Sequence, residues 1–348
     1  MELLEGTPRR GLGPRDLAAL IKPGIVASNT LTALAGAAFA ARGALGAGPL
    51  TASGGVGSGG GAGNGSPPLA LPLALPLALL AVAFGTAALV AGACVLNNWI
   101  DRDIDRSMER TRDRPTAAGR IGAGQALGLG FLLTALGLAT LAALGSTPAL
   151  LGFAGSLIYL GAYSLVVKRR STLSSFVGGL AGAIPPLIGW TAIDPHLSWG
   201  AALLFLFLLV WQQAHVRALA MARASEYRAA AIPMPGQREN GQLGVGLGEG
   251  RLGEGLPGKK LRGLGRPRFM VLLWIALLLP FPALLVAGTS GAWRLAFTLG
   301  AMAATLAWAA LGVLSARLES AAWGRLMFRM SLAVLVALSA GLMAIPQS

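Results

Sequence analysis

The chain has 348 residues, of which 54% are hydrophobic and 12% are charged, and its formal net charge is +14. Soluble globular domains carry about 25% charged residues, so this composition excludes an ordinary soluble domain and indicates a membrane protein. The single cysteine, Cys94, excludes an internal disulfide framework and a metal site built from cysteines.

Nine apolar stretches of about twenty residues follow one another, each long enough to cross the hydrocarbon core of a bilayer. Because an α-helix satisfies its own backbone hydrogen bonds in lipid, we expect an all-α membrane protein, a bundle of nine transmembrane helices. A helical bundle of this length in lipid need not split into several domains, so residues 1–348 are expected to form a single transmembrane domain. The expected spans are 22–41, 68–96, 122–144, 147–167, 172–192, 198–220, 268–289, 293–315 and 324–345.

The basic residues predict how this bundle lies in the membrane. With the N-terminus in the cytoplasm, 26 of the 28 Lys and Arg residues fall in inside segments, and only Arg42 and Arg294 fall outside. This asymmetry follows the positive-inside rule and predicts a cytoplasmic N-terminus and an outside C-terminus. The charge also attracts anionic membrane lipid. Nucleic acid is not an expected partner, because no basic–aromatic stripe or recognised binding module accompanies the charge.

Two low-complexity segments interrupt the apolar pattern. Residues 53–66 consist mainly of Gly and Ser, and residues 236–265 are rich in Gly with scattered charges. Such compositions behave as flexible chains, so we expect flexible loops at about 43–67 on the outside and at about 236–267 on the inside.

The strongest candidate site is the segment 97–115, NNWIDRDIDRSMERTRDRP, at the predicted cytoplasmic end of the second span. Residues four apart on a helix lie one turn above each other, which places several amide and carboxylate side chains near one stripe. These residues are Asn97, Asn98, Asp101 and Asp105. Such a row suits Mg²⁺, and the arginines that follow suit phosphate oxygens. A solvated loop with local ion pairs is the alternative, but acids at the end of a transmembrane helix usually mark a functional site.

Further polar residues follow the fourth and sixth spans at the same predicted side. Lys168 and Arg169 come directly after span four, where they could anchor the helix or provide a second phosphate clamp. His215 lies at the inner end of span six, and a histidine in this position is as often a hydrogen-bonded core residue as a ligand. Lys22, at the start of span one, is adequately explained as a lysine whose ammonium reaches the membrane surface.

At these residues the chain resembles the UbiA superfamily of intramembrane prenyltransferases. The spacing Asn97-xxx-Asp101-xxx-Asp105 is similar to the first aspartate-rich motif of that superfamily, and Glu226 is the one clear acid at its second motif. The full run 97–115 resembles the protohaem IX farnesyltransferases within it. The stretches KPGIV, GGLAGAIPPLIGW, WQQAH and EYRAAAIPMP resemble the same branch. The likeness covers spans one to six closely, and spans seven to nine by hydropathy alone.

The resemblance implies an enzyme that transfers the farnesyl group of farnesyl diphosphate to a vinyl group of haem b, giving haem o and diphosphate. It implies Mg²⁺ as cofactor, with the metal ligands Asn97, Asp101, Asp105 and Glu226. The implied catalytic residues are Asp101, Asp105 and Lys168. The implied substrate-binding residues are Asn97, Asn98, Arg110, Arg114, Lys168, Arg169, His215, Arg217 and Tyr227. Among these, His215 and Arg217 would orient the haem through its iron or its propionates.

The resemblance also implies a bacterial cell membrane, an active site on the cytoplasmic side, and contact with haem A synthase or oxidase assembly proteins. Two alternatives stay open. A superfamily member acting on an aromatic or quinone precursor is disfavoured by the segments 211–215 and 232–235, which resemble the haem branch. A transporter would show inverted repeats and broken mid-membrane helices. The sequence has no convincing repeat, and its charges cluster at the inner edge.

The charge asymmetry makes a testable prediction about topology. A reporter fused after Ser348 is expected outside the cell, and one fused within 236–265 inside, because three predicted spans lie between the two fusion sites. Paired fusions with an enzyme that is active only outside and a fluorescent protein that matures only inside measure the side. Finding both fusions on the same side would contradict the nine-span arrangement.

Overall fold

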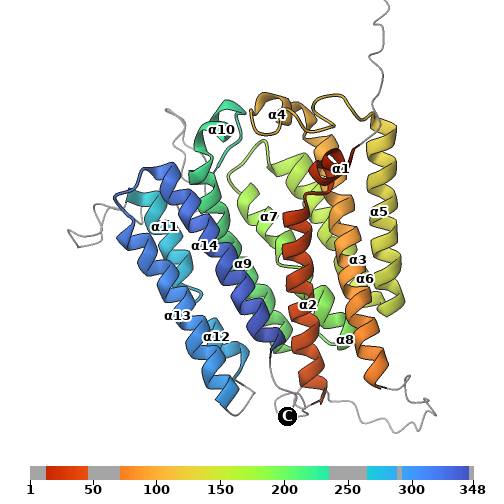
Figure 1. Cartoon of the computed structure of the whole chain (residues 1–348), viewed down its shortest axis with the longest axis vertical. Coiled ribbons are helices and arrows are strands. Elements are labelled where there is room, and N and C mark those ends of the chain that lie inside the picture. The colour runs from red at the N-terminus through yellow and green to blue at the C-terminus, as the bar shows by residue number, and fades with distance from the viewer. Residues whose placement is uncertain (1–12, 46–70, 235–264, 288–291, 345–348) are drawn as a thin grey trace, which may run out of the picture.

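The computed structural model describes residues 13–45, 71–234, 265–287 and 292–344. Over these ranges every regular element is a helix, and nine candidate spans are long and apolar enough to cross a membrane. The predicted class, a nine-span helical bundle, is therefore confirmed. The short helices α1 (Pro14–Ile21), α4 (Arg102–Ser107) and α10 (Ala224–Ala229) lie together at one end of the bundle (Figure 1). That this end faces the cytoplasm stays a prediction.

The observed spans agree with the predicted ones to within a few residues. They are α2 (Pro23–Leu45), α3 (Leu71–Ile100), α5 (Ala123–Leu144), α6 (Ser146–Leu157) with η1 (Ile158–Val167), α7 (Ser174–Gly182) with α8 (Pro185–Ile193), α9 (Trp199–Ala222), α11 (Gly265–Ala276) with α12 (Phe281–Leu285), α13 (Ala292–Leu314) and α14 (Ser320–Met343). The predicted flexible loops at 43–67 and 236–267 fall almost entirely outside the described residues.

Three spans are not continuous α-helices. Span four changes at Ile158 from an α-helix into a ten-residue π-helix, η1. Span five breaks between α7 and α8, where Pro185 occupies the first helical turn, a position that needs no N–H. Span seven breaks before α12, which follows Pro280. Such irregular backbone is tolerated at membrane depth where neighbouring helices bury it or where it lines a cavity.

Two glycines let the backbones of α2 and α8 touch. A Cβ added to Gly189 would lie 1.7 Å from the carbonyl oxygen of Ala33, and one added to Gly36 would lie 2.1 Å from that of Pro186. Since no side chain fits in either gap, the two helices pack at their closest possible separation here. Small residues at helix contacts are the usual means of close packing in lipid, where association gains little from the hydrophobic effect.

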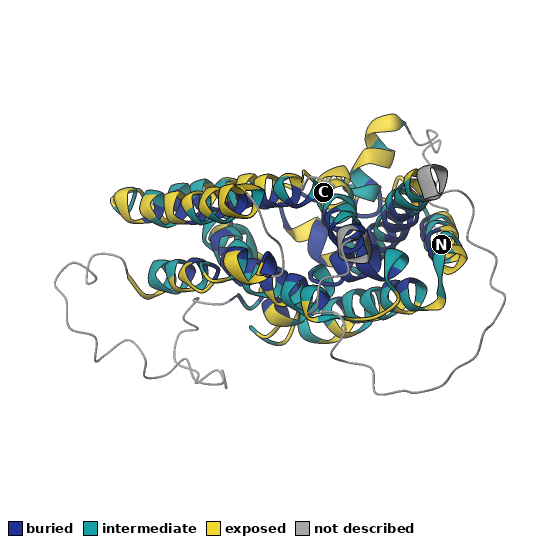
Figure 2. Cartoon of the chain, turned by 90° about the horizontal axis from the view of Figure 1, so that it is seen from below, coloured by how far each residue is buried: buried dark blue, intermediate teal, exposed yellow. Residues whose placement is uncertain are grey.

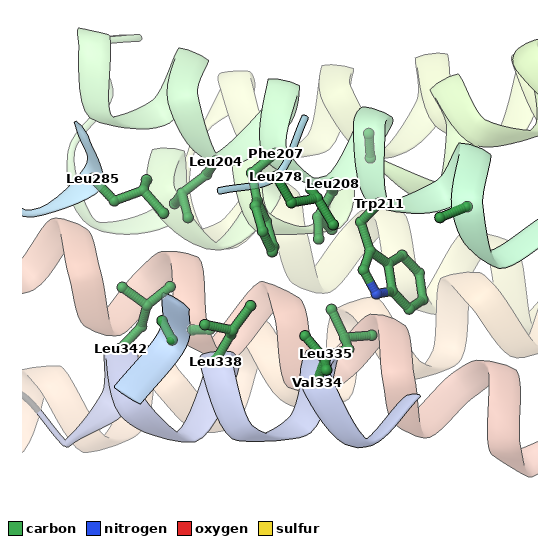
Figure 3. Close-up of a cluster of buried hydrophobic side chains, with 14 of the residues drawn as sticks. Leu204, Phe207, Leu208, Trp211, Leu278, Leu285, Val334, Leu335, Leu338 and Leu342 are labelled. Carbon is green, nitrogen blue, oxygen red and sulfur yellow. The ribbon is translucent and has the colours of Figure 1, made fainter. Parts of the chain in front are cut away.

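The apolar core runs along the contact of α9 with α14. Leu204, Phe207, Leu208 and Trp211 of α9 face leucines and a valine of α14 (Figure 3). Seen along the bundle, buried residues gather on the inward faces and exposed residues on the outward faces (Figure 2). Large apolar side chains such as Phe131, which is 62% exposed, also point outward. This outward apolar surface is the one that hydrocarbon solvates.

The α2–α8 contact makes a prediction about stability. Gly189→Ala is expected to destabilise the bundle, because a methyl group there must push α2 away; overpacking typically costs about 1–3 kcal/mol. Gly128→Ala, on a helical glycine of α5 with no atom within 4 Å of the added Cβ, is the matched control. Thermal unfolding of the purified proteins in detergent compares the two. Equal midpoints for the two variants would show that α2 and α8 do not depend on this contact.

Candidate active site

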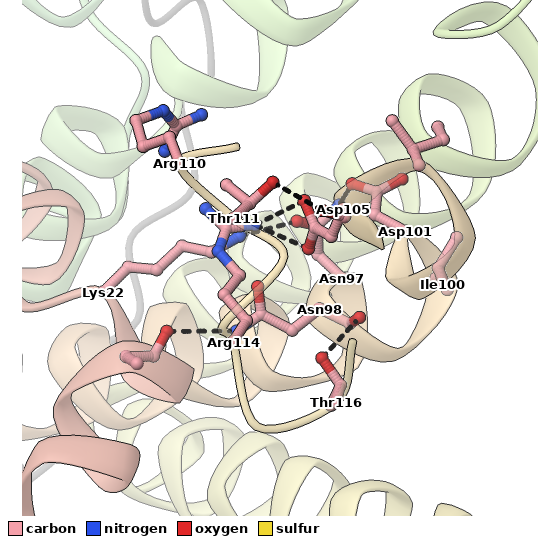
Figure 4. A network of polar contacts seen from close by, with 12 residues as sticks. Lys22, Asn97, Asn98, Ile100, Asp101, Asp105, Arg110, Thr111, Arg114 and Thr116 are labelled. Atoms are coloured by element: carbon pink, nitrogen blue, oxygen red, sulfur yellow. Dashed lines mark hydrogen bonds and ion pairs between the residues drawn. The ribbon is translucent and has the colours of Figure 1, made fainter. Parts of the chain in front are cut away.

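The acidic row of segment 97–115 lies where α3 ends. The helix stops at Ile100 and α4 begins at Arg102, yet the helical hydrogen bonds continue across the break. The Asp101 N–H donates to the Asn97 carbonyl at 2.9 Å, and the Asp105 N–H to the Asp101 carbonyl at 2.8 Å. Asn97, Asp101 and Asp105 therefore keep the spacing of successive turns and lie together, as predicted (Figure 4). All three are buried, at 3%, 1% and 4% exposure.

The two carboxylate oxygens of Asp101 differ in their hydrogen bonding, since one has partners and the other has none among the described residues. Its Oδ2 accepts a hydrogen bond from Nδ2 of Asn97 at 2.8 Å and forms a short ion pair with the ammonium of Lys168. Its Oδ1 is buried and has no hydrogen-bond partner among the described residues. An unsatisfied buried carboxylate oxygen is costly unless a ligand completes it. This oxygen is therefore the best-prepared position for a cation that binds with a substrate.

The π-helix η1 supplies the partners of the row. Its wider turn lets the Lys168 N–H bond to the carbonyl of Tyr163, five residues back, at 2.9 Å. Ser164 likewise donates its hydroxyl to the carbonyl of Tyr159 at 2.8 Å and accepts from Nδ2 of Asn97 at 3.0 Å. Segments of π-helix occur often at functional sites. Ser164 is not among the predicted site residues, because the change from α-helix to π-helix has no signal in the apolar pattern.

Asp105 is neutralised by an arginine from its own segment. The guanidinium of Arg114 bonds to both carboxylate oxygens of Asp105, at 2.9 Å and 2.7 Å (Figure 4). The Thr111 hydroxyl donates to the backbone carbonyl of the same aspartate at 3.1 Å and so fixes the turn that returns Arg114 to the row. Buried carboxylates require such paired, hydrogen-bonded partners.

Lys22 is a third cation at the row. It stands at the junction of α1 and α2, with a backbone φ of 54°, and its ammonium donates to Oδ1 of Asn97 at 2.7 Å. Burial lowers the pKa of Lys22 to about 8, although the residue as a whole is partly exposed. The structure thus places the ammonium of Lys22 in the site. Lys22, Arg114 and Lys168 outnumber the two carboxylates by one positive charge, which favours an anionic ligand.

A cavity of about 340 Å³ lies next to the row, inside the bundle. Cys94 of α3, one turn before Asn97, and Tyr163 of η1 line the end near the row. Apolar side chains such as Leu89 and Ile188 line most of the remainder, and His215 of α9 contributes to the wall. The end of span six therefore lines the cavity, and Cys94 and Tyr163 bring the cavity close to the acidic row, although none of the row's own residues belongs to its lining.

The chain is similar in sequence to proteins of a known family. The model of the UbiA prenyltransferase family matches residues 29–333. The chain belongs to the UbiA prenyltransferase family. Protohaem IX farnesyltransferase of Alkalihalophilus pseudofirmus is 39% identical to it over 249 residues, which cover 71% of each chain. Protohaem IX farnesyltransferase 2 of Bacillus subtilis is 36% identical over 254 residues, 73% of this chain and 74% of the relative.

Solved structures share the fold of this UbiA prenyltransferase at low identity. A UbiA homologue from Aeropyrum pernix superposes with a TM-score of 0.60 at 20% identity, covering 90% of this chain and 96% of its own. A UbiA homologue from Archaeoglobus fulgidus, solved with GPP and Mg²⁺, superposes with a TM-score of 0.59 at 14% identity, covering 95% and 100%. The arrangement of the nine spans is thus that of the family.

Several other predicted site residues of the UbiA prenyltransferase make contacts away from the row. Asn98 turns to α1, where its Nδ2 donates to the Leu20 carbonyl at 2.8 Å, and so holds α1 against α3. Arg169 forms two hydrogen bonds to Asp103, at 2.6 Å and 2.7 Å, which hold the pKa of Asp103 at about 2. Both of these residues border the site without facing Asp101, and their binding roles stay predictions.

Glu226 pairs with Arg110 instead of joining the aspartates. The guanidinium of Arg110 lies 3.1 Å from the carboxylate of Glu226 on α10, so the pair links the segment after α4 to the end of span six. Tyr227, beside it, packs against the apolar cluster under α4, and burial raises its pKa. No three of the described His, Cys, Asp and Glu residues are grouped closely enough to hold a metal ion by themselves.

His215 and Arg217, although two residues apart, have different surroundings. The ring of His215 lines the cavity. The guanidinium of Arg217 instead bonds to Oε1 of Gln213 at 3.0 Å and lies 5.3 Å from the ring of Trp274 on α11. Of the two haem contacts that the sequence suggested, the structure brings only His215 to the cavity.

The position of Lys22 makes a prediction about pH. Inorganic diphosphate is expected to bind the wild type most tightly at pH 7 and progressively more weakly as the pH rises through 8 to 9, because the free ammonium of Lys22, with a pKa of about 8, loses its proton over this range and a bound anion favours the charged form. Binding near pH 8 is therefore accompanied by proton uptake. Lys22→Arg keeps the charge at all these pH values, so its affinity should change less between pH 7 and pH 9.

Calorimetry at pH 7, 8 and 9, in buffers that differ in ionisation enthalpy, measures both the affinity and the proton uptake. The Lys22→Arg variant is the control for the protonation of diphosphate itself, which is the same for both proteins. Identical pH profiles in the two proteins would remove Lys22 from the anion site.

Proposed function

We propose that this UbiA prenyltransferase transfers the farnesyl group of farnesyl diphosphate to a vinyl group of haem b, with addition of water, giving haem o and diphosphate. The observation that carries the proposal is a row of buried acids, with cations beside it, close to one end of a mainly apolar cavity whose wall also contains a histidine. The relatives named protohaem IX farnesyltransferase, at 36–40% identity, support haem as the acceptor.

The acidic row fits Mg²⁺ that arrives with a diphosphate. Mg²⁺ in such sites takes one or two carboxylates and completes its shell with phosphate oxygens and water. Asp101, with its open Oδ1, and Asp105 would hold the ion, and Asn97 would assist through its amide oxygen. Bound there, Mg²⁺ would neutralise negative charge on the departing diphosphate. Among the described residues no third acid joins the two aspartates, which argues that the substrate itself has to complete the shell.

The cations of the row have a second use in this proposal. Without substrate, Lys168 and Arg114 neutralise the two carboxylates, which prevents uncompensated buried charge. With substrate, the same side chains and Lys22 would donate to diphosphate oxygens, and the arginine can do so with two parallel bonds. The surplus positive charge of the row then serves the leaving group, whose charge rises as the carbon–oxygen bond breaks.

The cavity provides what the carbon chemistry needs. Its apolar wall would hold the farnesyl chain and exclude bulk water, which would otherwise capture the allylic cation. The vinyl group forms the new bond to the first farnesyl carbon, and diphosphate leaves with the electron pair of the broken carbon–oxygen bond. The vinyl carbon attached to the porphyrin is then a carbocation. One water adds to this carbon and releases a proton, which leaves a hydroxyl group there. A cavity that is lined by His215 and ends close to the diphosphate row would bring these partners together.

Location and partners follow the same proposal. The row lies at the end of the bundle that carries α1, α4 and α10, and the positive-inside rule favours the cytoplasmic side for it. The chain would therefore lie in a bacterial cell membrane with its active site at the cytoplasmic face. Contact with haem A synthase or with oxidase assembly proteins stays a prediction from the resemblance, as does the single-domain organisation of residues 1–348.

Activity tests the proposal directly. Purified wild type incubated with farnesyl diphosphate, Mg²⁺ and haem b is expected to form haem o, detected by mass. Asp101→Asn and Asp105→Asn remove one charge each and should lower turnover by about 10²–10³-fold, as for loss of one group that stabilises developing charge. Asp103→Asn is the matched control, because this acid of the same segment pairs with Arg169 outside the row.

The outcomes test separately whether haem is the acceptor and whether the acidic row holds the metal and the diphosphate. If the wild type forms no haem o, while a quinone precursor is prenylated, the haem assignment is wrong. If all three variants keep the wild-type rate, the acidic row does not hold the metal and the diphosphate.

A further inference from the structure

The ring of His215 is fixed from both sides by two helices. It stacks on Trp211, one turn earlier on α9, with ring centroids 4.6 Å apart and planes 21° apart. On the other side Phe328 of α14 lies with its centroid at 4.7 Å. Ser331, also on α14 and fully buried, lies with its Oγ 2.7 Å from Nδ1 of the ring. The histidine is thus held in one plane and contacted at one edge.

The single hydrogen of the Ser331 hydroxyl determines which atom donates in the contact between His215 and Ser331. A serine hydroxyl has one hydrogen, and Ser331 directs it to the carbonyl oxygen of Phe328 at 2.6 Å. With that hydrogen used, Oγ can only accept from the ring, so Nδ1 of His215 must be the protonated nitrogen. In the neutral ring the proton on Nδ1 leaves Nε2 with a free lone pair.

The free lone pair of Nε2 belongs to a residue of the cavity wall. His215 lines the cavity, its Nδ1 edge is bonded to α14, and no described residue forms a hydrogen bond with Nε2. Trp211 strengthens this arrangement, because its Nε1–H donates to the backbone carbonyl of Ser331 at 3.1 Å. One residue of α14 therefore anchors both aromatic rings of α9 that form this part of the wall.

A lone pair suits a metal ion and does not suit a carboxylate. A propionate accepts hydrogen bonds, so it would need a proton on Nε2 as well, and a doubly protonated ring between two aromatic side chains would cost desolvation. A haem iron needs an unprotonated nitrogen, and histidine ligands of metals usually donate their other ring N–H to a neighbouring oxygen. The contact from His215 to Ser331 has this form.

We propose that Ser331 is a positioning residue that keeps His215 as the Nδ1–H tautomer, so that Nε2 binds the iron of the haem substrate and not a propionate. The inference rests on the proposed function, since it takes haem b as the acceptor. Iron ligation would fix the porphyrin relative to α9 and so determine which part of its edge, with its vinyl groups, can reach the farnesyl carbon.

Porphyrin binding to the full-length protein tests the proposal with three probes: haem b, haem b dimethyl ester and iron-free protoporphyrin IX. His215→Ala and Ser331→Ala are expected to lower the affinity for haem b and for its dimethyl ester, by about tenfold for Ser331→Ala, as is typical when the partner of a ligating histidine is removed. Both variants should shift the Soret band of bound haem. Their affinity for protoporphyrin IX should stay that of the wild type. Added imidazole should restore the wild-type band in His215→Ala.

Ser339→Ala is the matched control, because Ser339 is a buried serine further along α14 that makes no contact with His215. Affinity for inorganic diphosphate and the thermal midpoint, unchanged in every variant, show that the fold is intact.

Each result has one meaning. A loss that persists with protoporphyrin IX and disappears with the dimethyl ester would assign His215 to a propionate and overturn the proposal. Unchanged haem affinity and Soret band in folded His215→Ala and Ser331→Ala would overturn it as well. In both cases the wild type still binds haem b and forms haem o. Absence of haem binding by the wild type is a different result, because it contradicts the proposed function itself.

Discussion

Two carboxylates buried at the edge of a membrane bundle are the constraint on which the rest of the site depends. Asp101 and Asp105 are 1% and 4% exposed, and an ionised carboxylate in such a place is stable only with a cation and hydrogen bonds beside it. The chain meets this requirement from two directions. Arg114 returns through a turn of the same segment, and Lys168 reaches across from η1. The positions of these segments therefore follow from the need to neutralise two charges.

The same constraint explains why the helices are irregular near the site. A regular helix in lipid satisfies its backbone and leaves little that can bind a polar ligand. Here the α3–α4 junction, the π-helix and the break of span five all border the row or the cavity. The π-helix directs Ser164 and Lys168 to the acidic row, and α7 and α8 both contribute to the cavity wall. The regular spans α5 and α13, in contrast, carry large apolar side chains on their outward faces.

The cavity joins two chemistries that the chain keeps at separate walls. On one side, hydrogen-bond donors and cations surround the end of α3, where an anion is favoured. On the other side, α14 holds the ring of His215 between Trp211 and Phe328, where a flat aromatic ligand with a metal is favoured. Between them the lining is mainly apolar. The anion site therefore lies close to one end of the cavity, and the ring of His215 belongs to its wall.

Much of this could be predicted from the sequence because it depends on local spacing. The length and hydropathy of each stretch predict the nine spans, and the four-residue spacing from Asn97 to Asp105 predicts the row even though α3 ends within it. The motifs identify the family for the same reason, since they are contiguous. The membrane orientation is a prediction of this kind that rests on charge alone.

Contacts between distant segments could be decided only by the tertiary structure. Asn97 and Ser164, like Asp101 and Lys168, are 67 residues apart, and Lys22 reaches Asn97 across 75. The sequence assigned Asn98 to the row because the spacing fits, but the packing of α1 against α3 turns its side chain to Leu20. His215 shows the difference most directly. Its place near the inner end of span six is visible in the sequence, whereas its tautomer depends on a serine 116 residues later, which only the packing of α14 on α9 brings to the ring.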